Sequence, residues 1–336
     1  MRYYGGKGKL LDLIESGVSE TGLNEDSIFL DAFSGTSVVG EYFKRKNFTV
    51  YANDTLNHCY ALGKALIELN KEPTFSKLNE DLIDALNSLK GFPGFLTKNY
   101  SPYKTNLRKY FSVENAMKID EINYSIHDYK NNGKISIIEF YYLKASLLKA
   151  INLVSNVSGT YGAYLKKWDN RALKPIKLQK IDIYDNKKKN KVFNKDANKL
   201  VKEVEVDIAY LDPPYNSRQY HSNYFIPELI SRGWFDQEYE PKGVTGIVDF
   251  SHLKSEYSSK QFALTQLKDL IENISAKYIL LSYNNEGIVS NYDIATILKD
   301  KGELKIIDKE HKRYRSVNQD GSNIKTKEFL YVVKVK

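Results

Sequence analysis

The sequence predicts an α/β protein: a mostly parallel sheet with an antiparallel C-terminal strand, interrupted by an inserted, mainly helical domain. Three observations lead to this prediction. Short apolar runs bounded by turn or polar residues alternate with helical patterns. Between residues 60 and 185, long helical patterns and tyrosine-rich polar segments replace the strand signals. The last two apolar runs have no clear helical pattern between them, which favours a closing antiparallel hairpin.

The elements follow in order along the chain. The first three expected strands end at or near the acids Asp31, Asp54 and Asp212. Residues 1–59 and 186–336 are predicted to form one discontinuous sheet domain, and residues 60–185 the helical insertion. We expect strands at residues 28–31, 48–52, 206–211, 278–282, 304–307 and 329–335, and helices at residues 37–46, 56–69, 113–129, 136–154 and 262–274.

Charge and composition narrow the class of protein. The formal net charge is +8, which favours a polyanionic partner because each neutralised phosphate releases condensed counterions. The single cysteine, Cys59, excludes a disulfide framework or a cysteine-rich metal site and suits a reducing compartment. The first residues show no signal pattern, and no apolar run approaches the ~18 residues of a membrane span. We therefore expect a cytoplasmic protein without membrane association and without a metal.

The first strand leads into a glycine-containing turn and then a helix, which is the arrangement of a nucleotide-binding crossover. Gly35 lacks the Cβ that would keep a ligand away from the loop, although it could equally be an ordinary turn glycine. Asp54 follows at the end of the second strand, where an acid can accept hydrogen bonds from both ribose hydroxyls of a nucleoside. Its alternative role is the N-cap of the next helix.

Asp212-Pro213-Pro214-Tyr215 is the most specific motif, and it directly follows the strand at residues 206–211. The two prolines fix φ and remove two backbone donors, so the loop is rigid and presents oxygen acceptors. The Asp212 carboxylate and the Pro213 carbonyl can accept both N–H bonds of an exocyclic amino group and direct its nitrogen toward an electrophilic methyl group. Tyr215 can stack on an extruded base. A strand that simply ends in a proline turn is the alternative.

Together these segments resemble the Dam-like (alpha-class) N6-adenine DNA methyltransferases, including the methylases of type II restriction systems. The resemblance covers essentially the whole chain. The segments that carry it are Tyr3-Tyr4-Gly5-Gly6-Lys7, Asp31-Ala32-Phe33-Ser34-Gly35-Thr36, Asn53-Asp54 and Asp212-Pro213-Pro214-Tyr215.

The resemblance implies a Rossmann-like methyltransferase sheet that binds S-adenosyl-L-methionine, and it assigns roles to single residues. It places Lys7 near the methionine carboxylate of the cofactor, Asp54 at the ribose, and Asp212 at both the cofactor and the adenine. Asp196 resembles the acid beside the adenine amino group of the cofactor. Where the family's first loop often has a second glycine, this chain has Ser37. The full set of implied cofactor residues is Tyr3, Lys7, Asp31, Phe33, Gly35, Asp54, Asp196 and Asp212.

The same resemblance implies that the helical insertion reads the target on double-stranded DNA. Residues 156–167 combine small residues, tyrosines and lysines in an expected loop that suits groove and phosphate contacts, or that is a packed connection between helices. His311-Lys312-Arg313-Tyr314-Arg315 could hold backbone phosphates, or be a solvated hairpin. A separately encoded restriction endonuclease is an expected partner, and the protein is expected to be a monomer or a weak dimer.

The predicted function is transfer of a methyl group from S-adenosyl-L-methionine to N6 of adenine in a short DNA site, within a restriction–modification system. The adenine is extruded from the duplex and its amino nitrogen is the nucleophile, so Cys59 needs no catalytic role. Methylation of cytosine N4, or of adenine in RNA, uses the same geometry and is the alternative within the enzyme class. A module that binds cofactor and DNA without catalysis is the alternative from another class.

Overall fold

The computed structural model describes residues 6–78, 80–317 and 323–336, and the side chains of residues 311–326 are not among those described. Tyr3 and the side chains of the basic cluster at residues 311–315 therefore lie outside the described residues. The chain folds into two compact units. The sheet unit comprises Lys7–Thr55, Asn186–Gln219 and Ser255–Lys336, and the helical unit comprises Gly6, Leu56–Asp185 and Tyr220–Lys254.

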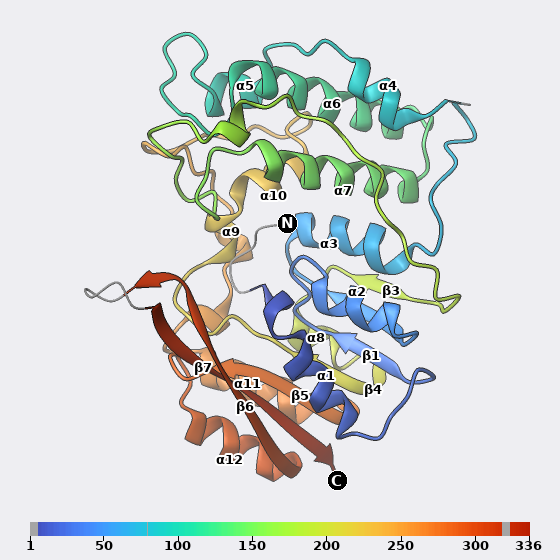
Figure 1. Ribbon diagram of the computed structural model, residues 1–336, viewed down its shortest axis with the longest axis vertical. Coiled ribbons are helices and arrows are strands. Elements are labelled where there is room, and N and C mark those ends of the chain that lie inside the picture. The colour runs from blue at the N-terminus through green and yellow to red at the C-terminus, as the bar shows by residue number, and fades with distance from the viewer. Residues whose placement is uncertain (1–5, 79, 318–322) are drawn as a thin grey trace. The chain divides into compact units, whose positions relative to one another are not determined.

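A seven-stranded sheet is the centre of the sheet unit (Figure 1). Its strands lie in the order β3-β2-β1-β4-β5-β7-β6. β1 pairs in parallel with β2 and β4, whereas β7 runs antiparallel to both of its neighbours, β5 and β6. The strands are β1 (Ile28–Asp31), β2 (Thr49–Asn53), β3 (Lys191–Phe193), β4 (Glu205–Leu211), β5 (Ser275–Asn284), β6 (Gly302–Val317) and β7 (Asn323–Val335).

Helices cover both faces of this sheet. Because side chains alternate between the faces of a strand, neighbouring residues such as Phe29 and Leu30 are buried on opposite sides. Phe29 stacks on Phe43 of α2, while Leu30 belongs to the core formed with α8, α11 and α12. One face carries the 3-10 turn η1 (Lys7–Lys9), α1 (Leu11–Ser19) and α2 (Val38–Arg45), and the other carries α8 (Ala197–Leu200), the 3-10 turn η5 (Glu256–Ser258), α11 (Ala263–Asn273) and α12 (Asn291–Lys301).

The predicted α/β class and the mostly parallel sheet with an antiparallel C-terminal strand are confirmed. Each predicted strand overlaps an observed strand, and the final pair is an antiparallel hairpin. In the sheet unit, α1, α8, α12 and β3 were not predicted. β3 has only three residues and begins at Lys191, the last residue of the lysine-rich run at residues 187–191, whose local composition is typical of a solvated loop. Its backbone pairing with β2 at the edge of the sheet outweighs that local polarity.

The helical unit is built around two long helices, each with a serine N-cap. Ser112 caps α6, and Ser136 forms a capping box with Glu139 at the start of α7. The predicted insertion at residues 60–185 lies within this unit, which also contains residues 220–254. The unit contains α3 (Asn57–Gly63), the π-helical turn η2 (Lys64–Glu68), α4 (Leu82–Ser88), α5 (Phe95–Tyr100), α6 (Val113–Asn131), α7 (Ile137–Val154), η3 (Asn170–Leu173), α9 (Tyr220–Asn223), α10 (Phe225–Arg232) and η4 (Ser251–Leu253).

Buried acids from neighbouring helices satisfy the first backbone N–H groups of two short helices. Asp120 of α6 accepts hydrogen bonds from the backbone N–H groups of Leu96 and Thr97 at the start of α5. Glu228 of α10 does the same for Asn57 and His58 at the start of α3. An acid is favoured here because the N-terminus of a helix carries partial positive charge. These tertiary caps join α5 to α6 and α3 to α10.

Candidate active site in the sheet unit

The order of the central strands brings three acids to one edge of the sheet. β1 lies between β2 and β4, and all three run in the same direction, so their carboxyl ends meet (Figure 1). Asp31 ends β1, Asp54 directly follows β2, and Asp212 directly follows β4. This edge is where open α/β sheets bind ligands.

The loop after β1 is held in place by β2 and β4. Ala32 N–H donates to the Tyr210 carbonyl at 3.1 Å, and Ser34 N–H donates to the Asn53 carbonyl at 2.8 Å. Gly35, with φ of 49°, donates its N–H to Asp54 Oδ2 at 3.0 Å. Gly35 and Asp54, which the sequence paired as parts of one nucleoside site, are therefore in direct contact.

Asp31 is more deeply buried than the other acids at this edge, with 1% of the residue exposed. Its Oδ2 accepts a hydrogen bond from Gly40 N–H of α2 at 3.0 Å. Burial, together with the nearby carboxylates of Asp212 and Asp54, raises its pKa to about 8. Asp31 therefore fixes α2 against β1, and its implied cofactor contact stays a prediction.

Ser37, the departure from the family pattern, has a left-handed backbone conformation with φ of 62° at the N-cap of α2. Its buried Oγ has no hydrogen-bond partner among the described residues. Glycine relieves the backbone strain and removes the unsatisfied hydroxyl. We expect Ser37→Gly to raise the free energy of unfolding by about 1 kcal/mol in urea denaturation. A loss of stability would show that the hydroxyl has a favourable role.

The Asp212 side chain belongs to a buried cluster of charges. Asp212 Oδ1 lies 3.1 Å from Lys7 Nζ, and the same ammonium group donates a hydrogen bond to Glu328 Oε1. Burial raises the pKa of Asp212 to about 6. The charge of Lys7 acts to lower this pKa, and the charge of Glu328 acts to raise it. Burial lowers the pKa of Lys7, but the two carboxylates outweigh it and raise that pKa well above its ordinary value.

Tyr215 is placed by the loop that follows β5. Its carbonyl accepts a hydrogen bond from Ile288 N–H at 2.9 Å, and its ring packs edge-on against Tyr283 with 5.7 Å between centroids. Lys7 Nζ lies 5.3 Å from the ring centroid. The ring is only partly buried, so it is fixed by its neighbours without being enclosed in the core.

Phe33 and Asp196 both interact with Tyr257 in the sheet unit. The Phe33 ring meets the Tyr257 ring edge-on at a centroid distance of 5.3 Å. Asp196 is exposed and caps α8 by accepting a hydrogen bond from Lys199 N–H at 3.1 Å. Burial and the Asp196 charge raise the pKa of Tyr257, whose hydroxyl donates to Asn198 Oδ1 at 2.5 Å. The aromatic ring and the acid, far apart in the sequence, are thus near one tyrosine.

Glu328 and Tyr257 are residues that the sequence analysis missed. Glu328 shares a face of β7 with Leu330 and Val332, because residues two apart point the same way along a strand. An acid on the buried face of an apolar strand was the available signal, since such a group is rarely buried without a partner. Tyr257 lies in a short 3-10 turn and gave no comparable pattern.

The residues at this edge fit a nucleoside cofactor with a cationic group. Asp212 Oδ1 is buried and accepts no hydrogen bond from any described residue, although it is paired in charge with Lys7. The remaining groups are the carboxylates of Asp54 and Asp196 and the half-buried ring of Phe33. Acids can accept bonds from ribose hydroxyls and an adenine amino group, and an aromatic ring can pack on a base. In the described part of the chain, no group of three or more His, Cys, Asp or Glu side chains could hold a metal ion.

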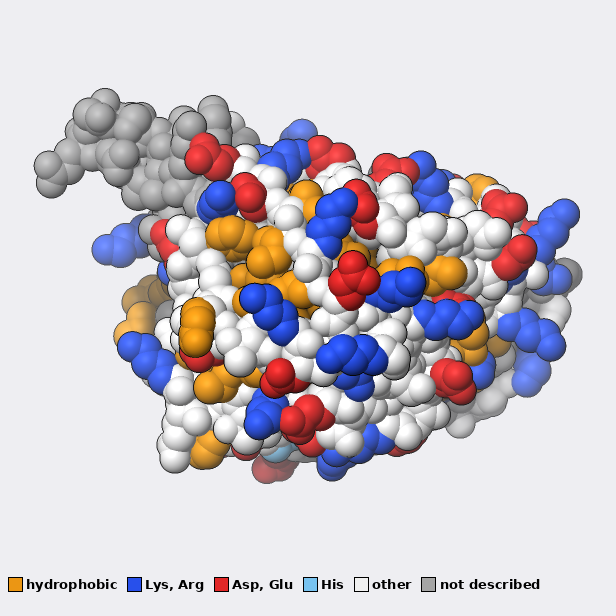
Figure 2. Space-filling view, turned by 90° about the horizontal axis from the view of Figure 1, so that it is seen from below, with side chains coloured by type: hydrophobic (Ala, Val, Ile, Leu, Met, Phe, Trp, Pro, Cys, Tyr) orange, Lys and Arg blue, Asp and Glu red, His pale blue; other side chains and the backbone are white. Residues whose placement is uncertain are grey.

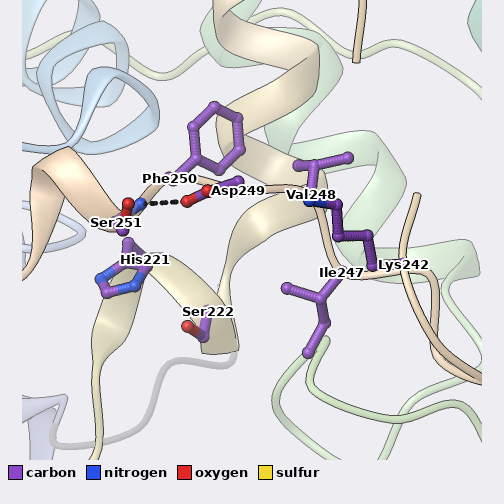
Figure 3. Close-up of a pocket in the computed structure, with 8 residues that line it drawn as sticks. All are labelled: His221, Ser222, Lys242, Ile247, Val248, Asp249, Phe250 and Ser251. Carbon is purple, nitrogen blue, oxygen red and sulfur yellow. Dashed lines mark hydrogen bonds between the residues drawn. The ribbon is translucent and has the colours of Figure 1, made fainter. Parts of the chain in front are cut away.

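A second concave site lies in the helical unit, in a groove of about 260 Å³ (Figure 3). The Asp249 carboxylate accepts a hydrogen bond from Ser251 N–H at 2.8 Å beside the buried imidazole of His221, whose pKa is lowered by burial. None of the predicted catalytic residues lines this groove. Its lining residues are His221, Ser222, Lys242, Ile247, Val248, Asp249, Phe250 and Ser251.

A parallel sheet with acids at its carboxyl edge and an Asp-Pro-Pro-Tyr loop after β4 defines a class of amino-methylating enzymes, and the sequence matches one family of them. The profile of the D12 class N6 adenine-specific DNA methyltransferases matches residues 3–297. The chain therefore belongs to the D12 class N6 adenine-specific DNA methyltransferase family.

Individual relatives agree with this assignment. The chain is 43% identical over 328 residues to modification methylase StsI of Streptococcus sanguinis, covering 95% of this chain and 49% of that protein. It is 40% identical over 344 residues to the type II methyltransferase M.FokI of Planomicrobium okeanokoites, covering 99% and 53%. It is 34% identical over 338 residues to M.NlaIII of Neisseria lactamica, covering 99% of both. The chain spans about half the length of the first two relatives.

Proposed function

We propose that this chain transfers a methyl group from S-adenosyl-L-methionine to N6 of adenine in a short double-stranded DNA site, as the modification activity of a restriction–modification system. The observation that carries this proposal is the Asp212–Tyr215 loop. It follows β4 at the carboxyl edge of the sheet. The neighbouring strand β1 ends at the same edge, and Gly35 in the loop after β1 donates a hydrogen bond to Asp54. The family and the named relatives supply the expected base and the biological context.

The loop residues act by holding the amino group. Asp212 and the Pro213 carbonyl accept the two N–H bonds, so that the nitrogen lone pair points away from the loop. Tyr215 packs against the face of the extruded adenine from its fixed position beside Tyr283. When bound, the cofactor would supply an electrophilic sulfonium methyl group, and its sulfur would keep the electron pair of the broken carbon–sulfur bond and leave as a neutral thioether. As the N6 nitrogen forms its new bond it becomes positive and then loses a proton, and Asp212 is the acceptor beside it.

The cofactor residues are proposed to divide between two ends of the binding site. Asp54 accepts hydrogen bonds from the ribose hydroxyls while one of its oxygens holds Gly35 N–H. Phe33 packs on the adenine of the cofactor, and exposed Asp196 accepts a bond from its amino group. Lys7 lies at the other end, where its ammonium charge can attract the methionine carboxylate as well as Asp212.

DNA is proposed to bind on three loops of the helical unit, at residues 101–109, 156–168 and 241–248, which we call the three-loop surface. Arg108 joins two of them by donating to the carbonyls of Gly243 and Val244 at 2.9 and 3.0 Å. Lys109 donates to the Lys166 carbonyl of the third at 3.4 Å. These loops contain six lysines and arginines and no aspartate or glutamate.

Within the three-loop surface, the segment predicted to read DNA contains both packed and exposed residues. Asn156 is fully buried and fixes the loop, since its amide donates to the Leu165 carbonyl and accepts from Asp169 N–H. Lys166 and Lys167 are exposed. By contrast, Figure 2 shows a face of the molecule on which Lys and Arg side chains are interspersed with Asp and Glu. The three-loop surface is proposed to meet the phosphates because its loops contain lysine and arginine but no aspartate or glutamate.

The double variant Lys166→Ala/Lys167→Ala tests the three-loop surface. We expect DNA affinity to fall about tenfold near 0.1 M salt, and the slope of log affinity against log salt to become shallower by about 2, because two phosphate contacts are lost. Fluorescence anisotropy with labelled duplex measures both. Lys268→Ala/Lys299→Ala, which removes two exposed lysines from α11 and α12, is the matched control. Equal losses in both variants would refute a specific role for this surface.

The wider context belongs to the same proposal. We propose a cytoplasmic protein that acts as a monomer or weak dimer, with a separately encoded restriction endonuclease as its partner. The names of the relatives, a modification methylase and a type II methyltransferase, support only the restriction–modification context. In the described part of the chain, no helix has both the length and the apolar character that a membrane crossing requires.

Expression in a host that lacks adenine methylation tests the proposed function. Single-molecule sequencing of the host DNA is expected to show N6-methyladenine at one short sequence motif. Modified cytosine at the motif, or modified adenine in RNA with unmodified DNA, would instead support the alternatives that use the same amino-nitrogen geometry. Unmodified nucleic acid together with measurable cofactor and DNA binding would support a non-catalytic module.

A further inference from the structure

Lys7 occupies a buried position between two carboxylates that come from distant parts of the chain. Its side chain is 5% exposed, that of Glu328 2% and that of Asp212 15%. Glu328 lies 321 residues from Lys7 in sequence, on β7, and accepts a hydrogen bond from its ammonium group. The lysine therefore does not neutralise Asp212 alone, because Glu328 engages the same charge.

Glu328 is itself held in place by the neighbouring strand. Ser282 of β5 donates its hydroxyl hydrogen to Glu328 Oε1 at 2.8 Å. The antiparallel register of β5 and β7 places Glu328 opposite Asn284 and Leu330 opposite Ser282. The carboxylate is therefore fixed by the sheet, and it can hold Lys7 in a set position beside the catalytic loop.

The charges of this cluster do not cancel. With Asp212 and Glu328 ionised and Lys7 protonated, the three side chains carry a net charge of −1. Among the described residues, Tyr210 of β4, Tyr215 and Asp31 of β1 also act electrostatically on this cluster. Burial keeps Tyr210 neutral by raising its pKa, and Asp31 is mostly protonated at neutral pH, so neither offsets the negative charge.

We infer that Glu328 is a positioning residue for methyl transfer: it anchors Lys7 and supplies a second buried negative charge, so that Lys7 does not cancel the negative charge of Asp212 where that carboxylate faces the target amine. This inference rests on the proposed function. The amine nitrogen becomes positive as its new bond forms, and a fixed negative charge nearby in a water-poor site stabilises that change. Without Glu328, Lys7 is free to pair with Asp212 alone and to cancel its charge.

Glu328→Gln tests this role because glutamine keeps the size and removes the charge. We expect kcat for methyl transfer to fall at least about tenfold, with the KM values for cofactor and DNA changed by less than about threefold. The charge of Glu328 raises the pKa of Asp212, so its removal should lower that pKa. The acid limb of kcat/KM, which reports the free enzyme, should then move to lower pH.

Exposed Glu303 of the adjacent strand β6 gives the matched control, Glu303→Gln, which should match the wild type in both measurements. Ser282→Ala, which removes one hydrogen bond from Glu328, should lower kcat by about two- to fivefold and serves if Glu328→Gln does not fold. A wild-type kcat and an unmoved acid limb in Glu328→Gln would overturn the inference. So would a lower kcat accompanied by an unmoved limb, because that pattern indicates only a structural role.

Carbon NMR of the protein labelled at aspartate carboxyl groups gives a readout that is independent of turnover. The Asp212 pKa in the cofactor-free protein is expected to be lower in Glu328→Gln than in the wild type and unchanged in Glu303→Gln. If wild-type protein methylates no nucleic acid, the proposed function fails, while this titration still decides whether Glu328 controls the charge of Asp212. An unchanged Asp212 pKa overturns the inference even if the wild type is active.

Discussion

Asp212→Ala is expected to lower the rate of methyl transfer at least about a thousandfold while DNA affinity stays within a few fold of wild type. The substitution removes the acceptor at the end of β4 and leaves Lys7 paired with Glu328, so the buried lysine keeps a partner. DNA binding is preserved because the three-loop surface lies in the other unit. Single-turnover transfer of labelled methyl groups measures the rate, and anisotropy measures the affinity.

Asp300→Ala, which removes an exposed carboxylate from α12 of the same unit, is the control for Asp212→Ala and should retain wild-type activity. If the Asp212→Ala variant keeps more than about a tenth of wild-type turnover, Asp212 is not the acceptor that orients the amine.

Glu228→Ala should lower the free energy of unfolding by about 3–5 kcal/mol, because the side chains that pair with the buried carboxylate lose their partner. Glu228 is 0% exposed and accepts hydrogen bonds from His58 Nδ1 at 2.8 Å and Arg232 Nε at 2.7 Å. It also caps α3, so its loss removes the hydrogen bonds that join the start of α3 to α10. Urea denaturation followed by circular dichroism measures the change, and exposed Glu238→Ala is the control, expected to lie within about 0.5 kcal/mol of wild type.

Glu228 also makes a specific contribution to acid stability. Although burial acts to raise it, the hydrogen bond and charge of His58 and the charge of Arg232 lower the pKa of Glu228 to about 2. A group with a lowered folded-state pKa stabilises the fold above its ordinary value near 4.5, and this stabilisation is lost as the pH falls toward 2. The unfolding free energy of Glu228→Ala should therefore vary less steeply than that of wild type between pH 4.5 and 2. Parallel curves would contradict this account.

The parts of the fold that the sequence predicted are those with a strong local pattern. β1 is a short apolar run that ends in Asp31, and β4 is one that is directly followed by Asp212. Pro213 and Pro214 indicate a loop after β4 from local sequence alone. The glycine turn and Asp54 were predictable because a crossover places its acid about twenty residues further on. Local pattern thus located the edge of the sheet at which these acids meet.

The parts that were missed depend on pairing between distant residues. Glu328 becomes a partner of Lys7 only when β7 inserts beside β5. Glu228 caps α3 from 171 residues away in the chain. A charged residue in an amphipathic helix is normally exposed, so the sequence did not indicate that Glu228 is buried. The apolar strand around Glu328 indicated burial, but not which residue would pair with it. Residues 220–254 also belong to the helical unit, and the sequence did not indicate this because they join the unit through contacts with residues distant in the chain.

The most direct measurement is transfer of a labelled methyl group from S-adenosyl-L-methionine to unmethylated duplex DNA, followed by digestion to nucleosides. With the wild-type protein, the label is expected in N6-methyl-2′-deoxyadenosine, and with Asp212→Ala it should be at background. Label in N4-methyl-2′-deoxycytidine, label in RNA from a parallel reaction but not in DNA, or equal label with both proteins would contradict the assignment of the Asp-Pro-Pro-Tyr loop as the site that holds the adenine amino group.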